Sequence, residues 1–353
     1  MPYPENKEFQ DILHKIHACL EKGLPFAAYR KPKKEEVTVV FQKDDSLHTT
    51  IDFEEKGFVF APFDLKDNAV LIQPDEVLSA LVEIEIKPEN SSIKFSDEGK
   101  DVHIGLIKKG ISEIEKGHLK KVVLSRKLGA EVSSTPPKIF QNLLNHYPNA
   151  FCYLFHHPKV GTWCGATPET LVEVKTNQLR TMSLAATLPF TGDTTPQWGL
   201  KEVEEQQMVS DYIQERLGPV VSALHIGEAK AVRAGNLWHL QSGITGILSS
   251  ENGIKKVIKA LHPTPAVCGI PTQAAKSFIL KNENYNRNFY TGFLGELNLN
   301  ETEETSLFVN LRCMELKGNK ATIFMGGGIT LASNPESEWV ETQNKSKTML
   351  NIL

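Results

Sequence analysis

Apolar residues along this chain recur at two spacings, one typical of helices and one typical of strands. Residues 7–22 place apolar side chains three and four positions apart, which predicts an amphipathic helix. Residues 102–117 predict a second helix, which ends at a glycine. Between them, residues 27–72 show short runs separated by charged turns, which predicts strands, among them 36–42, 47–53 and 57–63. The polar, turn-rich stretch 89–100 is the predicted linker.

The rest of the chain alternates further strands with helices. Strands are predicted over 121–128, 150–157, 161–167 and 236–248, and hairpins over 170–184 and 306–329, with turns at Thr176-Asn177 and 317–319. Helices are predicted over 201–217, 253–263 and 274–282, and after Asn334, which can cap a last helix that has Pro335 at its first position.

Hairpins outnumber strand–helix–strand units in this order of elements. We therefore expect an α/β fold of the α+β type, with large, mostly antiparallel sheets flanked by helices. Residues 1–95 are the expected amino-terminal portion and residues 96–353 the main region of one composite domain.

Composition and charge exclude several classes of protein. The chain has 353 residues, a net charge of −4 and charges of both signs interspersed, which is no footprint for nucleic acid or an anionic membrane. The longest apolar runs are too short for a transmembrane helix, which needs about 18 residues. The first ten residues lack the layout of a secretion signal, and the five cysteines form no CxxC. A cytoplasmic protein with reduced thiols is expected.

Two pairs of carboxylates have the same spacing and could form a metal site. Glu202 and Glu205 lie three residues apart near the start of one predicted helix, as Glu338 and Glu341 do in the last. Residues at this spacing face the same way, so two such pairs could supply the oxygen ligands that Mg²⁺ prefers. Glu205 also projects with the apolar face of its helix, where a carboxylate needs a partner or a metal. Acidic residues that favour the helix dipole are the alternative.

Four further residues carry possible chemistry. Lys121 opens the apolar strand "KVVLSR", where desolvation can make a lysine a base, and Glu169 in "GATPETL" enters an apolar strand, where desolvation makes a carboxyl an acid. Arg312 lies mid-strand among apolar residues and needs an anion, for which a carboxylate fits its fork. For Lys121, the alternative is a lysine at a strand end whose charged group reaches solvent. For His239, the alternative is a core histidine with a satisfied hydrogen bond.

Five stretches together resemble the chorismate-utilising enzyme family: "KVVLSR", "GATPETL", "LHPTPAVCG", "FVNLRC" and "GGGI…PESEWVET…K". They occur in the family's order across residues 105–353, and five motifs in order are far more specific than one. The resemblance implies an anthranilate synthase component I-like, chorismate-binding fold, with residues 96–353 as the catalytic region, chorismate as substrate and Mg²⁺ as cofactor.

Within the family, the chain looks most like the isochorismate synthases. These enzymes isomerise chorismate by attack of water at C2 and loss of the C4 hydroxyl. Salicylate synthase and aminodeoxychorismate synthase activities are the alternatives, as is a non-catalytic chorismate-binding subunit. Partner enzymes would belong to a menaquinone or a siderophore pathway.

The resemblance also implies roles for individual residues. Lys121 would be the base and Glu169 the acid. Glu205 and Glu341 would bind Mg²⁺, with Glu202 and Glu338 as outer or alternate ligands. The expected substrate-binding residues are Arg312, Gly326, Gly328, Ala186, Thr187, His239, Ala266, Val267 and Tyr290. Ala186 stands where the family commonly has glycine, and its methyl group could crowd the site if the backbone there has a positive φ.

Overall fold

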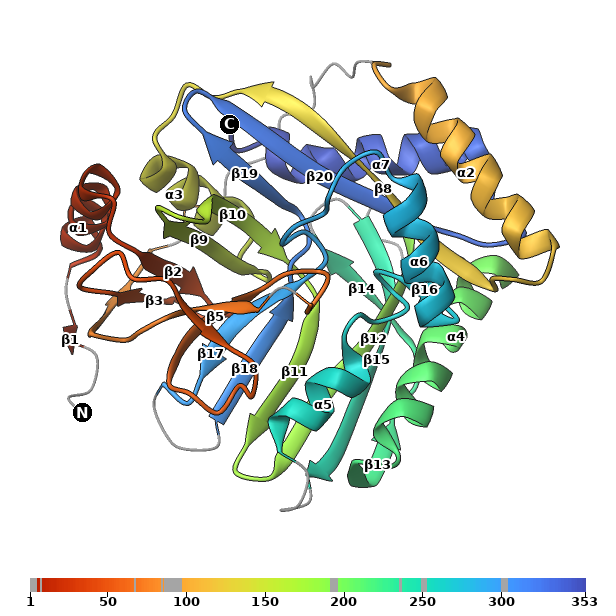
Figure 1. Cartoon of the computed structure of the whole chain (residues 1–353), viewed down its shortest axis with the longest axis horizontal. Coiled ribbons are helices and arrows are strands. Elements are labelled where there is room, and N and C mark those ends of the chain that lie inside the picture. The colour runs from red at the N-terminus through yellow and green to blue at the C-terminus, as the bar shows by residue number, and fades with distance from the viewer. Residues whose placement is uncertain are drawn as a thin grey trace.

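The computed structural model describes residues 5–6, 8–66, 68–83, 85, 97–190, 196–234, 237–248, 253–299 and 304–353. Within these residues the strands form two ten-stranded sheets. Every strand pairing is antiparallel except that of β1 with β7. The prediction of large, mostly antiparallel sheets flanked by helices is confirmed (Figure 1).

The first sheet has the strand order β1 (Glu5–Asn6), β7 (Glu76–Leu81), β3 (Glu36–Phe41), β2 (Phe26–Arg30), β9 (Phe151–His157), β10 (Gly161–Thr167), β19 (Cys313–Lys317), β20 (Lys320–Ile329), β8 (Lys121–Glu131) and β16 (Gly269–Ile270). The second has the order β13 (Val221–Ile226), β15 (Leu237–Leu248), β12 (Gln178–Pro189), β11 (Thr170–Lys175), β18 (Glu304–Val309), β17 (Phe293–Leu297), β5 (Gly57–Ala61), β6 (Ala69–Ile72) and β4 (His48–Thr50), with β14 (Lys230–Ala234) paired to β15.

Helices cover the outer faces of both sheets. They are α1 (Phe9–Lys22), α2 (Lys100–Glu115), α3 (Pro136–His146), α4 (Leu200–Leu217), α5 (Ile254–Leu261), α6 (Thr272–Asn282) and α7 (Pro335–Leu350). Apolar residues of α1 and α3 join the core of the first sheet, and those of α4 and α5 the core of the second. Figure 1 shows α1 and α3 on one side of the sheets and α2, α4 and α6 on the other.

Aromatic side chains fill the space between the two sheets. Phe151 of the first sheet stacks on Phe308 of the second with ring centroids 4.1 Å apart, and Tyr29 packs on Phe58 at 5.1 Å. Rings of this size bury much apolar surface, so this layer holds the two sheets together.

Two of the places where the chain crosses between the sheets lie side by side. Residues 168–169 lead from β10 to β11, and residues 310–312 lead from β18 back to β19. Two backbone hydrogen bonds join the crossings, from Val309 N to Glu169 O (2.9 Å) and from Ala166 N to Arg312 O (3.0 Å). Side chains at these crossings therefore meet at one point between the sheets.

This arrangement corrects two predictions. The stretch 306–329 is not one hairpin, because β18 pairs in the second sheet and only β19 and β20 form a hairpin in the first. The predicted strand at 47–53 is shortened to β4, because the hydroxyl of Thr50 accepts a hydrogen bond from Phe53 N (3.0 Å), where Phe53 has a φ of +61° and the chain turns.

Apart from α3, for which no helix was predicted, the described helices follow the remaining predictions closely. Asn334 caps α7 by accepting hydrogen bonds from Glu336 N and Ser337 N. Residue 7, residue 236 and residues 89–96 of the predicted linker lie outside the described residues. Strands from the amino-terminal portion pair in both sheets, β2 with β9 and β5 with β17. We propose on this ground that 1–95 and 96–353 are portions of one composite domain.

Candidate active site

A pocket opens beside these two crossings, with about 730 Å³ of empty space that includes the open solvent at its mouth. The predicted site residues that line it are Lys121, Glu169, Ala186, Thr187, Glu205, His239, Ala266, Val267, Tyr290, Arg312, Gly326, Gly328 and Glu341. Glu202 and Glu338 do not line it.

Lys121 and Glu205 meet in this pocket from different elements. Lys121 opens β8 with its side chain 1% exposed, and its Nζ lies 2.8 Å from Glu205 Oε1 on α4. Burial of Val209, one turn further along α4, holds that face of the helix inward, as the apolar spacing predicted. Burial acts to raise the pKa of Glu205, but the ammonium of Lys121 outweighs it and leaves the pKa below its ordinary value.

Glu169 is a buried acid at the first crossing. It precedes β11 and does not lie within a strand, and its backbone N–H donates to Thr167 Oγ1 (3.3 Å). Burial raises the pKa of Glu169 to about 8, although the nearby Lys121 acts to lower it. The carboxyl group is therefore largely protonated at neutral pH and can donate a proton.

Arg312 lies at the second crossing and not mid-strand as predicted. It connects β18 to β19 with a φ of +47°, because the chain changes sheets there, and its side chain is only partly buried. Its Nη1 donates to Thr348 Oγ1 (3.3 Å) while the residue lines the pocket. Ala186 (φ +59°) and Thr291 (φ +62°) also line the pocket, so strained backbone conformations gather at this site.

His239 is held as a neutral ring at the pocket wall. Burial lowers the pKa of His239 to about 3, helped by the cations of Arg312 and Lys345. Its Nδ1 lies 3.0 Å from Ala186 O, a carbonyl that can only accept, so Nδ1 carries the proton. Nε2 is then an acceptor, and no residue in the described part of the chain bonds to it. The ring is thus both buried and directed at the site.

Three consecutive glycines of β20 form the floor of the pocket. A Cβ on Gly328 would lie 2.5 Å from Glu205 Oε1, and one on Gly326 would lie 2.8 Å from Leu124 O. A Cβ on Gly327 would lie 3.3 Å from Glu338 Oε2 and 3.5 Å from Glu341 Oε1. Glycine is therefore needed at 326, where the clash is with the backbone, whereas at 328 a methyl group would displace the carboxylate of Glu205. Carboxylates from α4 and α7 converge on this strand.

Lysines pair with these carboxylates. Glu338 accepts from Lys201 (2.9 Å), and Glu341 accepts from Lys345 (2.5 Å), whose Nζ also donates to Gly326 O (2.9 Å). Lys345 is a pocket residue to which the sequence patterns assigned no role. Its position four residues after Glu341 was the signal that could have found it.

The acidic residues fit a divalent cation in their chemistry. Glu338 is 2% exposed, and its Oε2 has no partner among the described residues. Burial raises the pKa of Glu338, and the negative charge of the neighbouring Glu341 raises it further. Such a buried oxygen is suited to a hard cation. Within the described ranges, no three His, Cys, Asp or Glu side chains stand ready to hold a metal, since lysines occupy the carboxylates. Glu202 lies further out, with its carboxylate beside Gly199.

Most of the sequence matches the model of one family of enzymes. The profile of the chorismate binding enzyme family matches residues 69–353, and the chain belongs to this family. Several of its relatives are isochorismate synthases. Isochorismate synthase DhbC of Bacillus subtilis is 30% identical over 319 residues, which cover 83% of this chain and 79% of that protein.

Solved structures share the fold. The crystal structure described as a putative 2,3-dihydroxybenzoate-specific isochorismate synthase, DhbC from Bacillus anthracis, matches 96% of this chain and 99% of its own with a TM-score of 0.80 and 25% identity. MenF, the menaquinone-specific isochorismate synthase of Escherichia coli, matches 93% of this chain and 88% of its own with a TM-score of 0.76. At 20% identity that second match shows the fold alone.

Proposed function

We propose that this protein is an isochorismate synthase, an isomerase that converts chorismate to isochorismate. The observation that carries the proposal is the meeting of Lys121 and Glu169 in one pocket, with Glu169 largely protonated at neutral pH. A reaction that takes one proton and delivers another needs two such groups. Membership of the chorismate binding family supports chorismate as the substrate.

The reaction uses the two groups in turn. Lys121 acts in this step as the neutral amine, after the ammonium that pairs with Glu205 has released its proton to solvent. Water then attacks C2 of the ring and gives a proton to Nζ of Lys121. The C4 hydroxyl leaves as water with the proton of Glu169, and the ring double bonds shift. One water enters and one leaves, so the product is an isomer. Arg312, which lines the pocket, would bind a substrate carboxylate, and Nε2 of the neutral His239 would accept a hydrogen bond from a substrate hydroxyl.

Mg²⁺ is the proposed cofactor, held by Glu205 and Glu341 with Glu338 as a further ligand. The ion would neutralise a substrate carboxylate beside these acidic residues. Two observations support this assignment: the carboxylates offer the oxygen ligands that Mg²⁺ prefers, and Oε2 of Glu338 has no partner among the described residues. Glu202 would act only at a distance, through water.

The test is incubation of the purified protein with chorismate and Mg²⁺, with and without ammonia, and separation of the products by liquid chromatography. We expect isochorismate alone. Salicylate with pyruvate, or aminodeoxychorismate that appears only with ammonia, would assign the protein to another activity of the same fold. Chorismate binding without turnover would make it a binding subunit.

Replacing Lys121 with Met removes the base and retains most of the side chain's volume. Turnover should fall by about 10²–10⁴-fold while chorismate still binds. Unchanged turnover in this variant would contradict the proposed role of Lys121.

The place of the protein in the cell is a separate proposal. None of the helices in the described part of the chain combines the length and apolar character that a membrane crossing requires. A cytoplasmic location and partners in a menaquinone or siderophore pathway remain predictions, which fractionation and the identity of neighbouring genes can test.

A further inference from the structure

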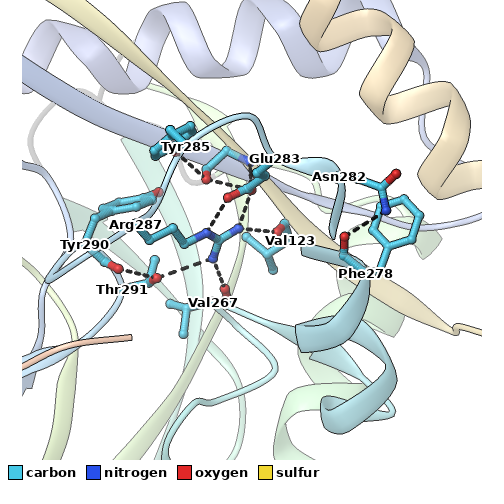
Figure 2. A network of polar contacts seen from close by, with 10 residues as sticks. Val123, Val267, Phe278, Asn282, Glu283, Tyr285, Arg287, Tyr290 and Thr291 are labelled. Atoms are coloured by element: carbon cyan, nitrogen blue, oxygen red, sulfur yellow. Dashed lines mark hydrogen bonds and ion pairs between the residues drawn. The ribbon is translucent and has the colours of Figure 1, made fainter. Parts of the chain in front are cut away.

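A buried ion pair lies directly behind the pocket wall (Figure 2). The guanidinium of Arg287 binds the carboxylate of Glu283 in two bonds, Nε to Oε2 at 2.8 Å and Nη2 to Oε1 at 2.6 Å. Both side chains are 1% exposed. A pair this deeply buried persists only when its other hydrogen-bonding positions are also satisfied.

All the donors of Arg287 are satisfied. Besides the two bonds to Glu283, Nη1 donates to Val267 O (2.9 Å) and Thr291 Oγ1 (3.3 Å), and Nη2 donates to Val123 O (2.7 Å). A guanidinium has five N–H groups in a fixed plane, and each has a partner here. No other side chain offers five donors in this geometry.

The acceptors belong to three segments that line the pocket. Val123 lies two residues after Lys121 in β8, and Val267 lies in the segment between α5 and β16. Thr291 lines the pocket on the side of the second crossing, which is formed by residues 310–312. Glu283 adds a fourth tie, because its Oε1 also accepts from the backbone N–H and the hydroxyl of Ser125 (both 2.8 Å). One guanidinium therefore sets the separation between β8 and the opposite wall.

We propose that Arg287, oriented by Glu283, is a positioning residue that holds the Ala266–Val267 wall at its working distance from the β8 segment carrying Lys121. The inference rests on the proposed function. Arg287 itself does not line the pocket, so it acts through Val123 and Val267. A displacement of one ångström in a reacting geometry can cost about 100-fold in rate, so the tie has a direct consequence for turnover.

The test compares Arg287→Lys with a matched control, Arg30→Lys, in the full-length protein. Lysine keeps the charge but has three donors and no fork, so backbone acceptors at the pocket lose their partner. Arg30 is also fully buried and donates to backbone carbonyls, Leu144 O (2.8 Å) and Tyr147 O (2.6 Å), neither of which lines the pocket. Both changes should lower the melting temperature.

Only Arg287→Lys should impair the site. We expect kcat/KM with chorismate and Mg²⁺ to fall at least about tenfold and chorismate Kd, measured in EDTA, to weaken at least about threefold, whereas Mg²⁺ Kd changes less than about twofold. Mg²⁺ affinity should be spared because the network touches none of the acidic residues of α4 or α7. A loss equal to that in Arg30→Lys, or none, overturns the inference.

Two further results keep the outcomes separate. If Arg287→Lys does not fold, Ser125→Ala removes one bond to Glu283 and should show the same pattern more weakly, and unchanged chorismate affinity and kcat/KM would overturn the inference.

If the wild type binds chorismate but makes no isochorismate, the proposed function fails, and the chorismate Kd of the variants alone then decides the positioning role.

Discussion

At the scale of single residues, the environment of Glu169 sets a pH dependence. Burial raises its pKa to about 8, so the folded state holds this proton more tightly than the unfolded chain does. The contribution to stability is complete below the ordinary pKa near 4.5 and is lost as pH rises through about 8. Turnover should also fall as pH rises through about 8, because Glu169 then loses the proton that it has to donate.

Replacing Glu169 with Gln tests both effects. Turnover should fall by about 10²–10⁴-fold, and the decline of stability between the two pKa values should flatten, as read from urea unfolding at several pH values. Glu173→Gln is the matched control, since Glu173 lies on β11 outside the pocket. An unchanged pH profile of the rate in Glu169→Gln would sink the assignment of this residue as the acid.

Ala186 bears a backbone strain that glycine would relieve. Its φ of +59° costs an L-residue roughly 1–2 kcal/mol, against roughly 0.5–1 kcal/mol for the greater freedom of glycine in the unfolded chain. Ala186 is also buried, so loss of its methyl group offsets part of this relief, and Ala186→Gly should be more stable than Ala185→Gly by about 1–2 kcal/mol.

Ala185→Gly is the matched control for this change, because Ala185 lies next to Ala186 in β12 and has no positive φ. That change should lower stability, since it removes a buried methyl group and adds freedom to the unfolded chain. Urea unfolding of the two variants decides the matter. Equal losses in both would mean that position 186 is not strained.

At the scale of elements, α7 carries two of the proposed metal ligands within its first two turns. Asn334 caps this helix through two backbone N–H groups at 3.0 Å, so Asn334→Ala should cost about 1 kcal/mol of stability. Fraying of the first turn should also weaken Mg²⁺ binding by Glu338 and Glu341, measured by titration calorimetry. Asn334→Ser keeps a capping oxygen and should retain wild-type affinity; weakening equal to that of alanine would show that the cap is not the cause.

At the scale of the whole molecule, both sheets contain strands from either side of residue 95. Separating the two portions would expose the edges of β9 and β17 and the aromatic layer between the sheets. We therefore expect one cooperative unfolding transition, with the same midpoint by circular dichroism and by fluorescence of the four tryptophans. Two separated transitions would show that residues 1–95 are an independent unit.

Local patterns were sufficient wherever the determining contacts are close in sequence. The inward phase of Glu205 followed from the apolar face that Val209 shares, and the start of α7 followed from Asn334 and Pro335. The place of Gly328 in β20 and the spacing of Glu338 and Glu341 could also be predicted from the sequence. Each depends only on neighbours within one strand or one helix turn. The helix α3 was not predicted, although Pro136 and Pro137 mark its start and Ile139, Phe140, Leu143 and Leu144 form its apolar face.

The sequence by itself determined the kinds of element, the family and the residue types of the site, since these depend on spacing and on motifs. Only the tertiary structure decided which sheet each strand joins, that Glu169 and Arg312 lie at neighbouring crossings, that Lys121 pairs with Glu205, and that Arg287 holds the pocket wall. The reason is physical: strand pairing and burial depend on residues more than a hundred positions apart, such as Arg287 and Val123, and no local spacing encodes that contact.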